Sequence, residues 1–142
     1  MKIVVDTNVI VSALLHSGSN PVLVMSLIAR KEIKLCLSED IFSEYQKVLA
    51  RPKFKRIDQK RVKKLLSQMK IEALWVEPQM SVDAIKDDPA DNKFLECALQ
   101  SGAEFIITGN TRHFPFSKFK GSLILTPREF LEYIAKSIFK LA

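Results

Sequence analysis

Three acidic residues, far apart in the sequence, stand where a carboxylate is costly unless a cation compensates its charge. Asp6 directly follows the apolar run Ile3 to Val5, so a buried strand would deliver it at its carboxyl end. Glu44 falls at the border of the apolar face of a helix predicted over residues 38–49. Asp91 is predicted on the apolar side of a later helix. Three such carboxylates at one edge of a sheet would repel one another, and a hard divalent cation such as Mg²⁺ or Mn²⁺ resolves that conflict.

A cation held by these acids would support one particular chemistry. Bound divalent metal can orient a water molecule, lower its pKa and stabilise the negative charge that develops on a phosphate. This is the logic of metal-assisted phosphodiester hydrolysis. Taken one at a time, the acids also have structural interpretations: Asp6 can cap the helix that starts near Val9, Glu44 can be an ordinary boundary residue, and Asp91 can be a helix N-cap.

The apolar pattern predicts the framework that positions these acids. Strands buried on both faces are indicated by short apolar runs at 3–5, 35–37, 73–76, 105–108 and 123–125. Helices are predicted between them: one capped by Asn20 with Pro21 in the first turn, and others beginning at Ser38, near Lys60, and at a capping box formed by Thr126 and Glu129. Strands that alternate with helices predict an α/β fold with a mainly parallel sheet. Ligands bind such sheets beyond the carboxyl ends of the strands, where the strand order reverses, and Asp6 would lie at such an end.

Composition favours one ordinary domain over residues 1–142. A chain of this length, with 47% hydrophobic residues, can bury a core without disulfides. Its two cysteines, Cys36 and Cys97, match no metal-binding spacing and are expected to be reduced core residues. No apolar stretch is long enough for a transmembrane helix and no signal peptide is evident, so we expect a soluble, cytoplasmic protein.

The positive charge is concentrated in one stretch, which we call the basic segment. The whole chain carries a net charge of +6, and residues 51–64 alone carry +7. The basic residues of this segment are Arg51, Lys53, Lys55, Arg56, Lys60, Arg61, Lys63 and Lys64. Such focused charge favours a polyanionic partner, either nucleic acid or an acidic protein, over a helix face that only aids solubility.

Four stretches, in this order and spacing, resemble the PIN-domain nucleases, and especially their VapC-like toxin branch. They are Val5-Asp6-Thr7-Asn8-Val9-Ile10, Glu44, Asp87-Asp88-Pro89-Ala90-Asp91-Asn92 and Ile107-Thr108-Gly109-Asn110. The resemblance spans nearly the whole chain. It implies a five-stranded parallel sheet in the order 3-2-1-4-5, an acidic Mg²⁺ or Mn²⁺ site and cleavage of single-stranded RNA. It also implies a homodimer and often a cognate antitoxin protein as partner.

The resemblance also assigns roles to individual residues. Asp6, Glu44 and Asp91 match the three acidic metal-binding positions, and Asn8 and Thr108 match supporting polar positions. The family's fourth acidic position falls at or just beyond Asn110, where this chain has Asn110-Thr111-Arg112-His113 and no acid. We therefore expect Asn110 to offer a neutral oxygen at this catalytic position. Arg112 is expected to contact phosphate, whereas His113 is either an exposed loop residue or a phosphate or leaving-group contact.

Three hypotheses follow for the function. The first is a metal-dependent endoribonuclease, the toxin of a type II toxin-antitoxin pair, with Mg²⁺ or Mn²⁺ as cofactor. The second is a PIN domain that binds RNA or a partner without cutting, because it lacks the fourth acid. The third, a phosphoryl-accepting switch, is disfavoured because that chemistry needs further acids beside Asp6, where Thr7 and Asn8 stand.

Overall fold

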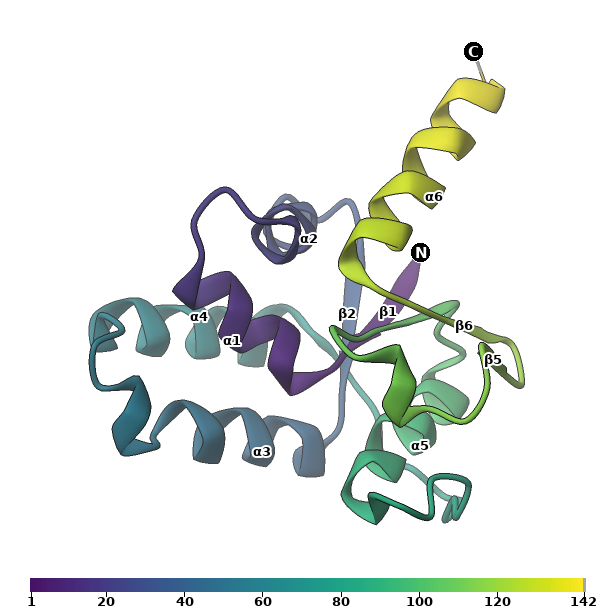
Figure 1. The fold of residues 1–142 in the computed structure, drawn as a ribbon, viewed down its shortest axis with the longest axis horizontal. Helices are drawn as coiled ribbons and strands as arrows, with labels where there is room; N and C mark the ends of the chain where they lie inside the picture. The colour runs from purple at the N-terminus through teal and green to yellow at the C-terminus, as the bar shows by residue number, and fades with distance from the viewer. Residues whose placement is uncertain (142) are drawn as a thin grey trace.

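The computed structural model describes residues 1–141 and is built around a six-stranded sheet (Figure 1). Its strands are β1 (Lys2–Val5), β2 (Lys34–Leu37), β3 (Leu74–Trp75), β4 (Phe105–Ile107), β5 (Lys118–Phe119) and β6 (Ser122–Leu125). They lie in the order β3-β2-β1-β4-β6-β5, and only β5 runs antiparallel to its neighbour. The predicted α/β fold with parallel order 3-2-1-4-5 is confirmed, because β6 takes the place expected for the fifth strand.

The prediction of five strands was one short. The additional strand, β5, has two residues and pairs with β6 across a short turn at Lys120 and Gly121. Lys118 is exposed and Phe119 is half-buried, so β5 has no apolar run of its own. Such an edge strand is defined by its pairing with a neighbour, which the local sequence pattern does not reveal.

The helices follow the predicted start signals closely. They are α1 (Thr7–Leu15), α2 (Asn20–Ala29), α3 (Glu39–Leu49), α4 (Gln59–Glu72), α5 (Asn92–Ser101) and α6 (Pro127–Leu141), with 3₁₀ turns η1 (Pro52–Phe54), η2 (Pro89–Asp91) and η3 (Thr111–His113). Among the described residues no single helix is both long and apolar enough to cross a membrane, although α1 and α2 together, across a 103° bend, meet that test by length and composition.

The helix caps confirm two of the predicted signals and correct a third. The Ser38 hydroxyl caps α3 by accepting from the Ile41 amide at 3.3 Å. Thr126 and Glu129 form the predicted capping box, each accepting from the other's backbone amide at 3.1 and 2.9 Å. The cap of α2 is Ser19, whose backbone is extended, and Asn20 is instead the first helical residue.

Strand β1 is the element that matters most for the site. It lies between β2 and β4, and the chain runs outward from it in one direction through β2 and β3 and in the other through β4 and β6. The carboxyl end of β1 is therefore the point where the strand order reverses. Its residues Ile3 to Val5 are fully buried, and α5 packs against β1, β2 and β4. Cys36 and Cys97 are free and buried, as predicted.

Candidate active site

Asp6 lies where β1 ends and α1 begins. Its backbone amide donates to the Ile107 carbonyl at 2.8 Å, which fixes it to the neighbouring strand β4. Asp6 takes the N-cap position of α1, but its carboxylate makes no side-chain capping hydrogen bond. Instead, its Oδ2 accepts from the Thr108 hydroxyl at 2.8 Å. The side chain thus faces the end of the sheet, although the residue is only 6% exposed.

Glu44 comes from the middle of α3, with a side chain that is 25% exposed. Its position depends on Tyr45, which is fully buried and donates its hydroxyl to the carbonyl of Val5, the last residue of β1. This bond holds α3 against the strand that carries Asp6. One oxygen of Glu44 accepts from the Thr7 hydroxyl, and the other lies 2.5 Å from the Lys93 ammonium.

Asp91 lies at the end of η2 and caps the start of α5 by position, without a side-chain capping hydrogen bond. Asp91 thus takes the N-cap position that the sequence allowed, and α5 begins one residue later, after a separate 3₁₀ turn set by Pro89. The loop before it is held by Asn92, whose buried amide bonds the backbones of Ala84, Ile85 and Pro89 at 2.9–3.1 Å. This loop carries Asp88 toward Asp91.

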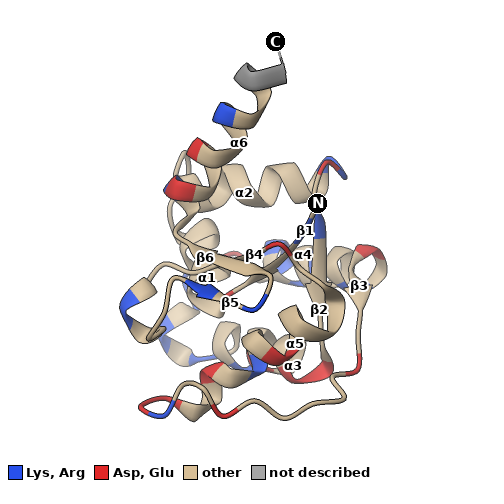
Figure 2. Ribbon diagram, turned by 90° about the vertical axis from the view of Figure 1, so that its right-hand side faces the viewer, with Lys and Arg blue, Asp and Glu red and all other residues tan. Residues whose placement is uncertain are grey.

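The acids influence one another electrostatically. Burial raises the pKa of Asp91 to about 6, and the charges of Asp6, Asp88 and Glu44 add to that rise. Burial also raises the pKa of Asp6, against the hydrogen bond from Thr108, and the charge of Glu44 raises it further. Carboxylates that resist ionisation in this way share a small, partly dry space. Figure 2 shows acidic residues on α3 and α5, which lie side by side.

The predicted supporting residues lie around this end of the sheet. Asn8 accepts from the Gly109 amide at 3.1 Å, so it joins α1 to the loop after β4. A Cβ at Gly109 would stand 3.3 Å from that same Asn8 oxygen, which explains the glycine. Asn110 follows, and its backbone amide donates to the Thr108 hydroxyl at 3.2 Å.

The side chain of Asn110 is used within its own loop. Its Oδ1 accepts from the Arg112 backbone amide at 3.3 Å, and its Nδ2 lies 3.0 Å from Nε2 of His113. His113 in turn places Nδ1 3.9 Å from Asp91 Oδ2. The structure thus links Asn110 to Asp91 through a histidine rather than directly.

The donor chemistry around this site suits a hard divalent cation. Asp6, Glu44 and Asp91 supply carboxylate oxygens, and a hydroxyl and amides surround them. Among the described residues, the acids and histidines whose ligand atoms all lie within 4.8 Å of one another are Asp88, Asp91 and His113. Asp6 and Glu44 do not belong to this group. The chemistry of these donors therefore fits Mg²⁺ or Mn²⁺. The donors that lie near one another are those around Asp91.

Sequence reasoning missed Lys93 and Thr7, which engage both oxygens of Glu44. Lys93 is two residues beyond Asp91, but its partner is 49 positions away, so no local pattern indicates the ion pair. Thr7 adjoins Asp6 and is 37 positions from Glu44. Both contacts depend on α3 and α5 packing beside the start of α1.

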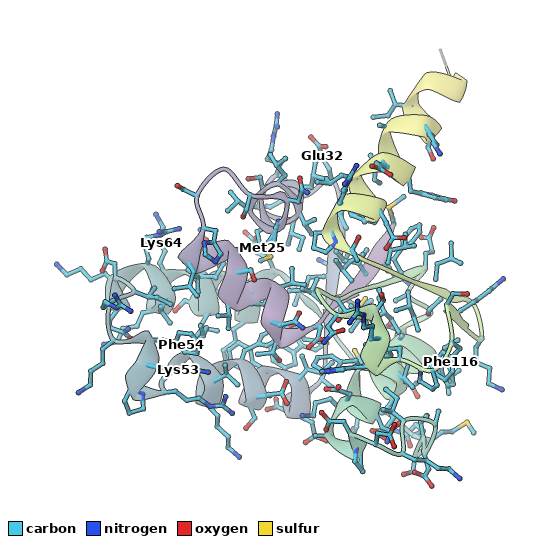
Figure 3. All side chains as sticks on the ribbon, viewed as in Figure 1. Met25, Glu32, Lys53, Phe54, Lys64 and Phe116 are labelled. Atoms are coloured by element: carbon cyan, nitrogen blue, oxygen red, sulfur yellow. The ribbon has the colours of Figure 1, made fainter. Side chains whose placement is uncertain are left out.

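The basic segment follows the carboxyl end of α3, the helix that carries Glu44. All eight of its predicted residues are exposed, on the chain between α3 and α4 and in the first turns of α4. In Figure 3, Lys53 and Lys64 lie at one end of the molecule, and Lys53 stands over the Phe54 ring at 5.1 Å. Arg112, also exposed, lies on η3 directly after Asn110 and is the predicted basic residue nearest in sequence to the site.

Comparisons with known proteins agree with this architecture. An uncharacterized protein of Methanocaldococcus jannaschii is 28% identical over 148 residues, covering 97% of this chain and 94% of that protein. VapBC2 from Rickettsia felis, solved in complex with a DNA fragment from its promoter, matches 87% of this chain and 97% of its own, with a TM-score of 0.56 and 14% identity. That likeness shows a shared fold. The PIN domain family model matches residues 2–112, from β1 to the loop that holds Asn110, and the chain therefore belongs to the PIN domain family of nucleases.

Proposed function

We propose that this protein is a metal-dependent endoribonuclease that hydrolyses single-stranded RNA, with the whole chain acting as one domain. One observation carries the proposal. Asp6, Glu44 and Asp91 come from three distant parts of the sequence, and burial together with the charge of Glu44 raises the pKa of both Asp6 and Asp91. A divalent cation bound among these carboxylates would relieve their mutual repulsion.

Each residue has a distinct task in this mechanism. Mg²⁺ or Mn²⁺, when bound, supplies an activated water and stabilises charge on the scissile phosphate. Asp6 and Asp91 would hold the cation, and the Thr108 hydroxyl donates to the Asp6 carboxylate and fixes its orientation. Glu44 pairs with the Lys93 ammonium, and this ammonium, 19% exposed, would contact a phosphate oxygen of the substrate. Asn8 keeps the loop after β4 close to α1.

The proposal is tested by cleavage of an unstructured RNA in Mg²⁺ or Mn²⁺, in EDTA, and with Asp6→Asn. We expect EDTA to stop cleavage and the substitution to slow it at least about 100-fold, because it removes a charged ligand from the metal. Asp83→Asn is the matched control, since Asp83 is exposed and makes none of the contacts described above. Cleavage that survives both EDTA and Asp6→Asn would mean that another nuclease is responsible.

The basic segment would bind RNA beyond the cleavage site. Helix α3 has 11 residues, about 16 Å in length, with Glu44 near its middle and the basic segment beginning just past its end. A substrate must therefore extend beyond the scissile bond to touch both the acids and the segment. We expect the segment to affect the binding of long RNA and not that of a dinucleotide.

This expectation is checked with the triple variant Lys60→Gln, Lys63→Gln, Lys64→Gln. Loss of three phosphate contacts should weaken binding of a long RNA about 100-fold near 0.1 M salt and reduce the slope of log affinity against log salt by about 2. Lys34→Gln, Lys118→Gln, Lys136→Gln removes the same charge from exposed positions on β2, β5 and α6. Equal losses in the two variants would show that only net charge matters.

A second candidate function is a PIN domain that binds RNA without cutting it. It is favoured by Asn110 at the fourth acidic position and by the Lys93 ammonium on Glu44. Metal titration separates the two candidates. If Mn²⁺ neither raises the melting temperature nor supports cleavage while RNA binding persists, the protein is a binding module.

The physiological role that fits a small PIN nuclease is the toxin of a toxin-antitoxin pair. The structural neighbour from Rickettsia felis is a VapBC2 protein bound to promoter DNA, and its fold supports the analogy. We propose a cognate antitoxin and a homodimer as partners and the cytoplasm as location. We expect a small DNA-binding protein to be encoded beside this chain. It should copurify with the chain and suppress cleavage.

A further inference from the structure

The oxygen donors that the family pattern assigns to the metal are only partly available in this chain. Both oxygens of Glu44 already have partners, the Thr7 hydroxyl and the Lys93 ammonium. Asn110, at the fourth acidic position, uses its oxygen for the Arg112 amide. A cation in this site therefore needs a further ligand, and the side of the site around Asp91 is where other donors lie close together.

His113 is the donor that the structure brings to that side. Its Nδ1 lies 3.9 Å from Asp91 Oδ2, and the ligand atoms of Asp88, Asp91 and His113 lie within 4.8 Å of one another. Two donors that share one cation at about 2.1 Å each stand no more than about 4.2 Å apart. The 3.9 Å separation satisfies this limit without movement of the backbone.

The other ring nitrogen of His113 lies next to a polar side chain. Metal-ligating imidazoles bond through their second nitrogen to a neighbouring polar group, which fixes the ring. Nε2 of His113 lies 3.0 Å from the side-chain amide of Asn110. A metal at Nδ1 places the ring proton on Nε2. The side-chain amide of Asn110 would then turn by 180° and exchange its bond from the Arg112 amide for one from the His113 ring. Asn110 thus orients the ring of His113 and does not itself supply a carboxylate.

We infer that His113 is a metal ligand, and that its imidazole nitrogen replaces the missing fourth carboxylate. The inference rests on the proposed metal site and adds a consequence for selectivity. Imidazole suits transition metals better than it suits Mg²⁺, which prefers oxygen alone. The site of this chain therefore selects Mn²⁺ over Mg²⁺ more strongly than an all-carboxylate site does.

The test measures metal binding and ligand identity without any RNA. Mn²⁺ and Mg²⁺ are titrated by calorimetry into the full chain, and the Mn²⁺ complex is examined by electron spin echo envelope modulation. His113→Gln is compared with His16→Gln, which removes the other of the two histidines, at the end of α1. His113 has a side chain that is 51% exposed, so both variants should melt with wild type in EDTA.

We expect a ¹⁴N signal from a directly bound imidazole in wild type and in His16→Gln, and none in His113→Gln. Mn²⁺ affinity should fall at least about tenfold in His113→Gln, and Mg²⁺ affinity should change less. Bound Mn²⁺ without a ¹⁴N signal in wild type, or with one that persists in His113→Gln, overturns the inference and leaves the proposed function intact. Failure of wild type to bind Mn²⁺ overturns both.

Discussion

Asp91→Asn is expected to abolish RNA cleavage and, at the same time, to make the metal-free protein more stable at neutral pH. Cleavage should fall at least about 100-fold because a charged metal ligand is lost. Stability should rise because the Asp91 carboxyl, with a side chain only 14% exposed among other acids, is costly to ionise in the folded protein. Asparagine keeps the shape of the side chain and removes that cost.

The sign of the stability effect follows from the pKa of Asp91. The folded protein raises this pKa from 3.8 to about 6, so it binds the proton more tightly than the unfolded chain does. The stability that the folded protein gains from its tighter proton binding at Asp91 is fully present below pH 3.8. This gain is lost as the pH rises through about 6. A shift of about 2 pKa units corresponds to about 3 kcal/mol, which is the upper limit of the gain expected for Asp91→Asn at pH 8.

The measurement is urea unfolding in EDTA at pH 8 and at pH 3.5. Asp91→Asn should be more stable than wild type at pH 8, and the difference should shrink at pH 3.5, where Asp91 is protonated in the folded protein. Asp83→Asn, at an exposed position, should show neither effect. If Asp91→Asn is less stable than wild type at pH 8, the ionised Asp91 carboxylate does not destabilise the folded protein.

Lys93→Met is expected to move metal binding and catalysis in opposite directions. The Lys93 ammonium lies 2.5 Å from Glu44 and adds positive charge beside the acids. Its removal frees an oxygen of Glu44 and lowers the repulsion of a divalent cation, so Mn²⁺ should bind about tenfold more tightly. Cleavage should nevertheless slow about 100-fold, because the transition state loses a cation near the phosphate.

Calorimetry with Mn²⁺ and single-turnover cleavage measure these two effects. Lys93→Arg keeps the charge and should retain wild-type metal affinity, and Lys70→Met, at an exposed position on α4, should change neither quantity. If metal affinity falls together with the cleavage rate, Lys93 serves only to hold α3 and α5 together.

Local sequence patterns predicted the α/β fold class, five of the six strands and the main helix starts. The apolar run before Asp6 became the central strand, and the caps at Ser38 and Thr126 start the helices that they predict. These features are local, because side-chain burial in a strand and hydrogen bonding at a helix start depend on residues a few positions apart. The family pattern supplied the strand order and the three candidate acids.

The partners of those acids come from contacts between distant parts of the chain. Asp6 meets a hydroxyl 102 positions away, and Glu44 meets an ammonium 49 positions away. Asp91 meets the ring of His113, which the sequence left as either an exposed residue or a phosphate contact. These pairings arise where β1, α3, α5 and the loop after β4 converge, and strand order and helix packing set them. The sequence thus named the acids, and the three-dimensional arrangement determined how each is compensated, because electrostatic interaction depends on distance in space and not on separation along the chain.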